Sequence, residues 1–546
     1  MIKEPPLFIH SGQHDKVGAD YLNTLFDTAA KLKAPDVHMH WVNDHVVIQM
    51  RIGDHMKHVE TINAGLGRML DDKIRARANM DLSQRHAAID GRMSLRYPER
   101  AIDVRVSVLP SHAGQKIVCR LLDQSNASMT LDDIHMPMLV KHHFMEMLKE
   151  PQGLILVTGP TGSGKTTTLY AALNELNDGT LNINTLENPV EYVIPEFVQV
   201  NVTPFITFAK GLRALLRQDP DVILVGEIRD AETAEIAMQA ANTGHLVLST
   251  LHTNNAAQAV PRLIDLGVDK QALASTLLGV IAQRLVQTLN SNVPHQWTDV
   301  TDFEAHWLKT NGLPMIKGQV PRATAKESFS GKRPIIEMIK SDKHVRAAIL
   351  SNGGELGVLN AATRQPQFDT LGQAGIRMVS AGATTMELVQ RLIKDDSVAP
   401  SVRRIGDVLL AQGLVSFSEI NDAAESQLAL MLEGKVRKVG QILVDQGLVT
   451  QEQVAKAIGY TEGAVDFLYE LAARRLLPYR EVQSVVQIWR TERHQESLFD
   501  LVIEQKLITQ EKLDEEVYRS DGRHYVTDIA PVHDGSGANA SSAVAV

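Results

Sequence analysis

The chain has 546 residues, of which 44% are hydrophobic and 22% charged, values typical of globular proteins with buried cores. This length predicts about three or four domains. The formal net charge of -10 disfavours nucleic acid as the main partner, because surfaces that track phosphates are usually basic. Cys119 is the single cysteine, which excludes a disulfide framework and a zinc site built from cysteines.

The first 20 residues read as a leader without the apolar core of a signal peptide. Residues 21–123 then have the pattern of a small α+β domain: a helical apolar period over 21–34 precedes alternating, strand-like segments at 37–41, 46–50, 103–107 and 116–121. The sequence contains no run of about 18 apolar residues, the length needed to cross a bilayer. We therefore expect a cytoplasmic protein whose membrane association, where there is any, is peripheral and depends on partners or on a surface contact.

Residues 130–395 predict an α/β domain. Apolar runs without alternation at 154–157, 222–225 and 246–248 are typical of strands buried on both faces. Helical segments between them predict βαβ units and a parallel sheet. From 290 to 395 we expect mixed loops and helices.

Residues 400–525 contain an internal repeat. The pattern at 413–420 recurs at 447–454, with weaker copies at 475–482 and 506–513. Thr450 with Gln453 predicts a capping box, and Thr509 keeps only the cap. We interpret this region as an all-α domain of four helix-turn-helix units, followed by a disordered tail at 526–546.

A phosphate-binding loop lies between the buried strand 154–157 and a helix. Backbone N–H groups of such a loop converge on phosphate oxygens at a helix N-terminus. Lys165 is expected to reach the β- and γ-phosphates of ATP, and the Thr166 hydroxyl to bind Mg²⁺. The predicted nucleotide-binding residues are Gly159, Pro160, Thr161, Gly162, Ser163, Gly164, Lys165, Thr166 and Thr167.

Carboxylates and histidines supply further candidates. Glu227 follows the strand 222–225, and the carboxyl ends of parallel strands form the ligand crevice. Glu187 and Glu191 surround a proline and suit metal or water positioning, a solvated loop being the alternative. Of His245 and His252, which flank the strand 246–250, one is expected near the γ-phosphate and the other in a structural role; their spacing matches no zinc site.

Arginines can stabilise the charge of a transferring phosphoryl group, sometimes from a neighbouring subunit. Arg105 and Arg120 lie on candidate strands of the first domain, and Arg213, Arg217 and Arg229 lie near the loop's own domain. A surface salt bridge is the alternative for each.

Together these motifs closely resemble the secretion-ATPase superfamily of type II secretion and type IV pilus assembly motors. The matching segments are 159–168, 187–191, 213–230, 244–255 and 283–286, with Asp90-Gly91-Arg92, 103–107 and 120–122 in the first domain. The resemblance implies an N-terminal PAS-like domain, a RecA-like ATPase domain, and a homohexamer that hydrolyses ATP and moves an inner-membrane platform protein. It also implies catalytic roles for Glu227, Glu187, Glu191 and His252, with Arg105 and Arg120 completing a neighbour's site.

Three departures from the family pattern stand out. Asn188 occupies a position that is usually Asp, and no cysteine lies between 290 and 340, so no zinc is expected. The repeats resemble N-terminal domains of such motors, yet lie C-terminal here. We favour a protein-docking role for them; cyclic di-GMP binding, suggested by Arg404, Gly406 and Gln427, is the alternative.

Two functional alternatives remain open beside pilus or pseudopilus assembly. The first is a pilus retraction motor, which the missing zinc module and the short N-terminus favour. The second is a nucleic-acid translocase on the same core, which the acidic charge disfavours.

Overall fold

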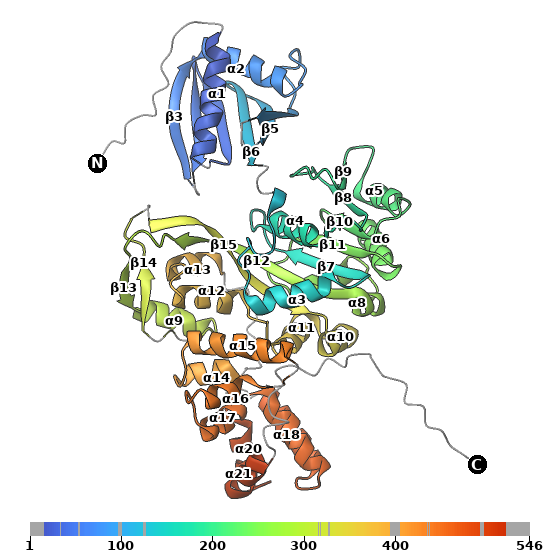
Figure 1. Ribbon diagram of the computed structural model, residues 1–546, viewed down its shortest axis with the longest axis vertical. Coiled ribbons are helices and arrows are strands. Elements are labelled where there is room, and N and C mark those ends of the chain that lie inside the picture. Colours follow the sequence, from blue (N-terminus) through green and yellow to red (C-terminus); the bar gives the residue numbers. More distant parts are fainter. Residues whose placement is uncertain are drawn as a thin grey trace, which may run out of the picture. The chain divides into compact units, whose positions relative to one another are not determined.

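The computed structural model describes residues 16–32, 34–52, 55–96, 101–123, 127–314, 316, 318–325, 328–393, 405–433, 435, 437–491 and 496–519. The chain divides into two compact units, residues 1–129 with 190–195, and residues 130–189 with 196–546 (Figure 1). None of the described helices is both long and apolar enough to cross a bilayer. The predicted tail at 526–546 lies outside the described residues.

Unit 1 is an antiparallel sheet with two helices packed on it (Figure 1). The six strands have the order β3-β2-β1-β6-β5-β4. Burial alternates along β1 and β2, which matches the period-2 pattern of the sequence. Helix α1 begins at Lys16, inside the expected leader. The elements are α1 (Lys16–Lys31), β1 (Asp36–Val42), β2 (His45–Ile52), β3 (His55–Asn63), α2 (Ala64–Arg77), β4 (Ile89–Arg96), β5 (Ala101–Ser111) and β6 (Gly114–Asp123).

The core of unit 2 is a mixed α/β fold around a seven-stranded sheet of order β15-β12-β7-β11-β10-β8-β9. All neighbouring strands are parallel except β12 and β15. β7 and β11 are buried along their whole length, as continuous apolar runs predict. The first elements are α3 (Met138–Leu148), β7 (Gly153–Thr158), α4 (Lys165–Leu176), β8 (Ile183–Glu187), β9 (Val198–Asn201), α5 (Phe208–Leu215), β10 (Val222–Val225), α6 (Ala231–Asn242), β11 (Leu246–Leu251), α7 (Ala259–Asp265), α8 (Lys270–Thr276) and β12 (Leu277–Leu289).

The segment expected to hold mixed loops and helices contributes strands to the fold. β15 pairs with β12 over almost its full length. β13 and β14 form a small two-stranded antiparallel sheet, and α9 lies between them in the chain. The Glu304 carboxylate of α9 binds the Arg322 guanidinium and the Thr301 hydroxyl. The elements are β13 (Gln296–Asp299), α9 (Asp302–Thr310), β14 (Gln319–Arg322), β15 (Phe329–Lys340), α10 (Lys343–Leu350), α11 (Gly354–Ala362), α12 (Leu371–Ser380) and α13 (Met386–Leu392).

The described elements after residue 404 are all helices, and their turns repeat. Gly413 and Gly447 have positive φ angles of 69° and 72°, and Arg475 and Lys506 take the same conformation in the weaker copies, at 61° and 57°. The capping box of Thr450 with Gln453 is confirmed. The helices are α14 (Ile405–Ala411), α15 (Phe417–Leu432), α16 (Val439–Asp445), α17 (Gln451–Ile458), α18 (Glu462–Ala473), α19 (Tyr479–Thr491), α20 (Leu498–Glu504) and α21 (Gln510–Arg519).

Candidate nucleotide site

The loop 159–164 joins the carboxyl end of β7 to the N-terminus of α4. Gly159, Gly162 and Gly164 have φ angles of 145°, 80° and 89°, which L-residues rarely adopt. A Cβ atom on Gly159 would lie 2.5 Å from the Gln283 carbonyl oxygen, whereas one on Gly162 would meet nothing within 4 Å. The loop is therefore closely packed against Gln283 at Gly159 and open at Gly162, as a phosphate-binding loop requires.

Two side chains of the loop carry its polar chemistry. The Lys165 ammonium donates to the carbonyl oxygens of Gly159 and Pro160, at 2.8 and 3.0 Å. The Ser163 hydroxyl is buried and has no hydrogen-bond partner among the described residues. Thr166 and Thr167 are half-buried in the first turn of α4. An anion at this N-terminus would meet donors and the positive end of the helix dipole, so these residues fit a nucleotide phosphate.

Gln283 on β12 supports the loop from behind, and the sequence did not identify it as a site residue. Its amide nitrogen donates to the Ser163 carbonyl at 2.8 Å, and its amide oxygen accepts from the Thr168 hydroxyl at 2.9 Å. The side chain is 1% exposed. Because a buried primary amide can donate and accept at once, a single residue fixes both the loop and the first turn of α4.

Glu227 lies just beyond β10, in the carboxyl-end region of the sheet. Its carboxylate is 2.5 Å from Arg229 Nε and 3.5 Å from His252 Nε2. Arg229 and His252 also line a cavity of about 620 Å³. The structure thus brings together three candidates from two strand ends, Glu227 with Arg229 after β10 and His252 after β11.

The other histidine and two arginines of unit 2 lie in different surroundings. His245 Nδ1 is 3.1 Å from the Ala240 carbonyl, at the amino end of β11 and so at the opposite end of the sheet from the loop. Arg213 forms an exposed ion pair with Glu232 at 2.6 Å. Arg217 donates to the Arg213 carbonyl. These contacts match the structural and salt-bridge alternatives.

Glu187 is a buried carboxylate at the end of β8. Its two oxygens accept from the Tyr170 hydroxyl at 2.8 and 2.9 Å, and Oε1 also accepts from the Thr185 hydroxyl at 2.6 Å. Gln199 donates in turn to the Tyr170 oxygen. Tyr170 lies on α4, the helix that follows the phosphate loop. Sequence reasoning missed it because a single tyrosine on a helix carries no motif.

Three arginines form a row across the sheet of unit 1. Arg105 is directly opposite Arg92 on β4 and Arg120 on β6, so the three side chains share one face. Arg92 pairs with Asp103, Arg120 pairs with Asp36 at 2.8 Å, and Arg105 donates to the Val190 carbonyl at 2.6 Å. Arg92 is the member that the sequence analysis did not choose as a site residue. Glu191, in the segment 190–195, also belongs to unit 1 and is half-buried.

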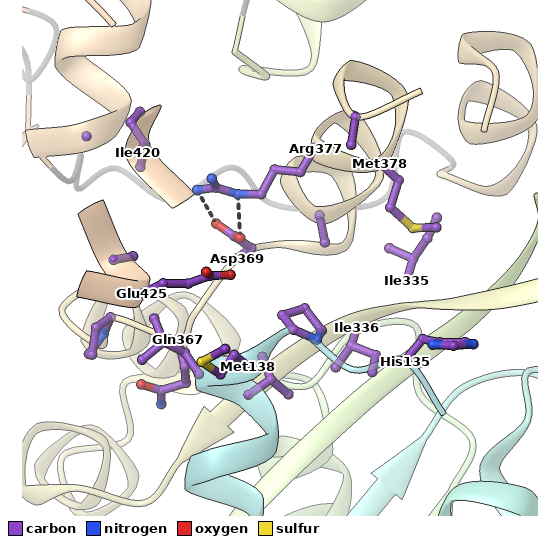
Figure 2. A pocket seen from close by; sticks show the side chains of 18 of the residues that line it. His135, Met138, Ile335, Ile336, Gln367, Asp369, Arg377, Met378, Ile420 and Glu425 are labelled. Atoms are coloured by element: carbon purple, nitrogen blue, oxygen red, sulfur yellow. Dashed lines mark hydrogen bonds and ion pairs between the residues drawn. The ribbon is translucent and has the colours of Figure 1, made fainter. Parts of the chain in front are cut away.

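A separate cavity of about 360 Å³ lies between α3, β15, α12 and the helices α14 and α15 (Figure 2). Its wall is largely apolar, with Met138, Ile335 and Met378 among the lining residues. The ion pair of Arg377 with Asp369, with contacts of 2.7 and 3.2 Å, forms part of the same wall. This cavity is distinct from the phosphate loop.

Comparison with known proteins agrees with this geometry. A family model described as "Type II/IV secretion system protein" matches residues 13–391. Type II secretion system protein E of Dickeya dadantii is 42% identical over 390 residues, covering 70% of this chain and 77% of that protein. Type II secretion system ATPase E of Vibrio cholerae is 39% identical over 382 residues, covering 68% and 75%.

Solved structures show the same fold. The Legionella pneumophila ATPase DotB superposes with a TM-score of 0.53 at 22% identity, covering 68% of this chain and 95% of that one. The pilus retraction motor PilT, solved with bound ADP, gives a TM-score of 0.50 at 26% identity, covering 68% and 96%. The helices after residue 404 lie outside the matched family region. With more than half of the chain matched and relatives at about 40% identity, this protein belongs to the type II/IV secretion system protein family.

Proposed function

We propose that this protein is a ring-forming ATPase motor that powers assembly of a type II secretion pseudopilus. The carrying observation is the open glycine cradle of 159–164, with Glu227 and His252 beyond the ends of β10 and β11, in a chain about 40% identical to type II secretion E proteins. ATP is the substrate, held by residues 159–167. Peripheral association with the inner membrane would depend on a platform protein of the secretion system.

Each candidate residue has a proposed task. Lys165 neutralises the β- and γ-phosphates, and the Thr166 hydroxyl holds Mg²⁺, which would offset the charge on the phosphate oxygens. Glu227 orients the attacking water, and its contact with His252 would let that side chain respond to the γ-phosphate. Glu187 orders water and metal from the end of β8, and Glu191 keeps the acidic-loop role that the family resemblance implies. Asn188 supplies only an amide and no carboxylate.

We propose that the row of arginines in unit 1 completes the site of a neighbouring subunit. Three guanidinium groups on one face of the sheet concentrate positive charge, which Asp103 and Asp36 offset in part, and such a row would attract an anionic phosphate. Arg105 and Arg120 would contact the phosphates of the neighbour in a homohexamer. We also propose that unit 1 is a PAS-like domain. The helical repeats after residue 404 would dock a partner protein.

Replacement of Lys165 tests the nucleotide assignment. Lys165→Ala removes the ammonium from the cradle and is expected to abolish ATP turnover while leaving the melting temperature within a few degrees of the wild type. Lys149→Ala, an exposed lysine at the end of α3, is the matched control and should retain full turnover. Unchanged turnover in Lys165→Ala would contradict the assignment.

The retraction alternative is supported by the likeness to PilT. Deleting the gene in its host separates the two directions of movement. Loss of secretion or of surface filaments is expected for an assembly motor, whereas accumulation of filaments would indicate retraction. Stimulation of ATP turnover by DNA or RNA would instead favour a translocase.

A further inference from the structure

Glu337 is a buried carboxylate that lies outside the candidate nucleotide site. It is on β15, opposite Ala282 of β12, and is 2% exposed. Its Oε1 accepts from the backbone N–H of Ala256 at 2.8 Å, and its Oε2 from that of Leu371 at 3.1 Å. One side chain therefore joins two segments that are far apart in the sequence.

The first of these segments is the loop 252–258, which begins with His252. Its start is tied to the strand of the phosphate loop, because the Thr158 hydroxyl accepts from the Thr253 N–H at 2.9 Å and donates to the Leu251 carbonyl. Arg284 donates to the Asn254 carbonyl at 2.6 Å. The position of Ala256 therefore depends on the end of the sheet that holds the nucleotide site.

The second segment is the first turn of α12. Leu371 is the first residue after the N-cap Thr370, and its N–H has no partner within the helix. A carboxylate at this position satisfies that donor and is favoured by the helix dipole. Farther along α12, Arg377 and Met378 line the cavity of about 360 Å³ (Figure 2).

A buried carboxylate costs stability unless its oxygens are hydrogen-bonded, and an apolar side chain would fill the same space without that cost. Glu337 spans two backbone donors on two separate segments, which no apolar residue could do. We propose that Glu337 is a positioning residue that couples the loop 252–258 to α12. Displacement of this loop on nucleotide binding moves Ala256, and the carboxylate passes the change to α12 and the cavity wall. The inference rests on nucleotide binding at 159–167.

Hydrogen–deuterium exchange of the full-length protein with Mg·ADP tests this coupling. In the wild type, ADP should slow exchange in peptides covering both 252–258 and 370–378. In Glu337→Gln one backbone donor faces an amide NH₂ group in place of an oxygen. ADP should then still slow exchange at 252–258, but its effect at 370–378 should fall by about fivefold.

Two further variants separate coupling from loss of structure. Leu371→Pro removes the N–H that Glu337 binds on α12, at a helix position where proline is well accommodated, and it also shortens a side chain that is 7% exposed. It should likewise weaken the response at 370–378. Glu304→Gln, a buried glutamate of α9 without a contact to either segment in the described hydrogen bonds, should respond like the wild type. An undiminished response at 370–378 in both Glu337→Gln and Leu371→Pro would overturn the coupling, whereas failure of wild-type protein to bind ADP would overturn the proposed function.

Discussion

The Tyr170 hydroxyl donates to the Glu187 carboxylate, with 2.8 and 2.9 Å to its two oxygens, and so joins the helix after the phosphate loop to the acidic end of β8. If Glu187 positions water or metal, this contact sets its orientation. A neutral donor to a charged acceptor contributes about 1.5–3 kcal/mol.

Tyr170→Phe keeps the ring and removes only this donor. We expect kcat for ATP hydrolysis to fall about tenfold with little change in KM, because Glu187 loses the orientation in which it acts on the transition state, while ATP binding is not affected. Tyr21→Phe, which removes an equivalent hydroxyl contact to Glu60 in unit 1, is the matched control. Equal kcat values for the two variants would show that the Tyr170 contact has no catalytic role.

The amide of Gln283 predicts an effect on nucleotide affinity. Gln283→Ala leaves the Ser163 carbonyl and the Thr168 hydroxyl without their buried partner, so the cradle loses its fixed shape. We expect the dissociation constant for ADP to rise about tenfold, or roughly 1.4 kcal/mol. Fluorescence titration with a labelled ADP measures it. Gln287→Ala, four residues farther along β12, should bind like the wild type, and equal affinities for the two variants would contradict a positioning role.

Glu337 also predicts a pH dependence of stability. Burial is the main cause that raises its pKa to about 7, and Glu355 adds to this, whereas the N–H groups of Ala256 and Leu371 and the charge of Arg284 oppose it. A carboxyl group whose pKa is raised on folding stabilises the protein below its unfolded pKa, and this contribution is lost as the pH rises through about 7.

Glu337→Gln cannot ionise. Between pH 5 and pH 8 its free energy of unfolding should therefore rise relative to that of the wild type by up to about 3 kcal/mol, and its melting temperature should rise with it. Glu304→Gln is the control. Arg322 is the main cause that holds the pKa of Glu304 at about 2, so its difference from the wild type should stay constant over this range. A constant difference for Glu337→Gln as well would refute the prediction.

The ion pair of Glu304 with Arg322 predicts that the module of β13, α9 and β14 folds without zinc. A zinc chelator should leave the melting temperature unchanged.

Arg322→Met leaves the buried Glu304 charge uncompensated and should cost about 3 kcal/mol. Arg391→Met breaks an exposed pair with Glu387 and should cost well under 1 kcal/mol. Destabilisation by the chelator would show that a metal stabilises the fold.

Local patterns predicted the parts of the site whose chemistry is local. The glycines at 159, 162 and 164 with Lys165 identify a cradle within eight residues, and Glu227 is found because it follows a buried apolar strand. Gln283 and Glu337 could not be found in this way. Their partners Ser163 and Ala256 lie far away in the sequence, and only the pairing of β12 with β7 and β15 brings them together.

The missed strand β15 has a similar physical explanation. Residues 330–333 are exposed, with Lys332 and Arg333 in succession, and only residues 335–339 are buried. Periodicity therefore gives a signal too short to predict twelve residues of strand. Arg105 and Arg120 were each identified as candidates from the sequence. Their alignment with Arg92 could not be predicted, because it depends on the pairing register of β4, β5 and β6.

In the proposed ring, Arg105 of one subunit completes the phosphate loop of another. The most direct measurement mixes two inactive variants, Lys165→Ala and Arg105→Ala, and assays ATP turnover after the subunits exchange. A mixed ring would pair an intact loop from the Arg105→Ala subunit with an intact arginine from its Lys165→Ala neighbour. We predict that turnover reappears in the mixture. Turnover no higher than that of either variant alone, in rings shown to contain both, would contradict the shared site.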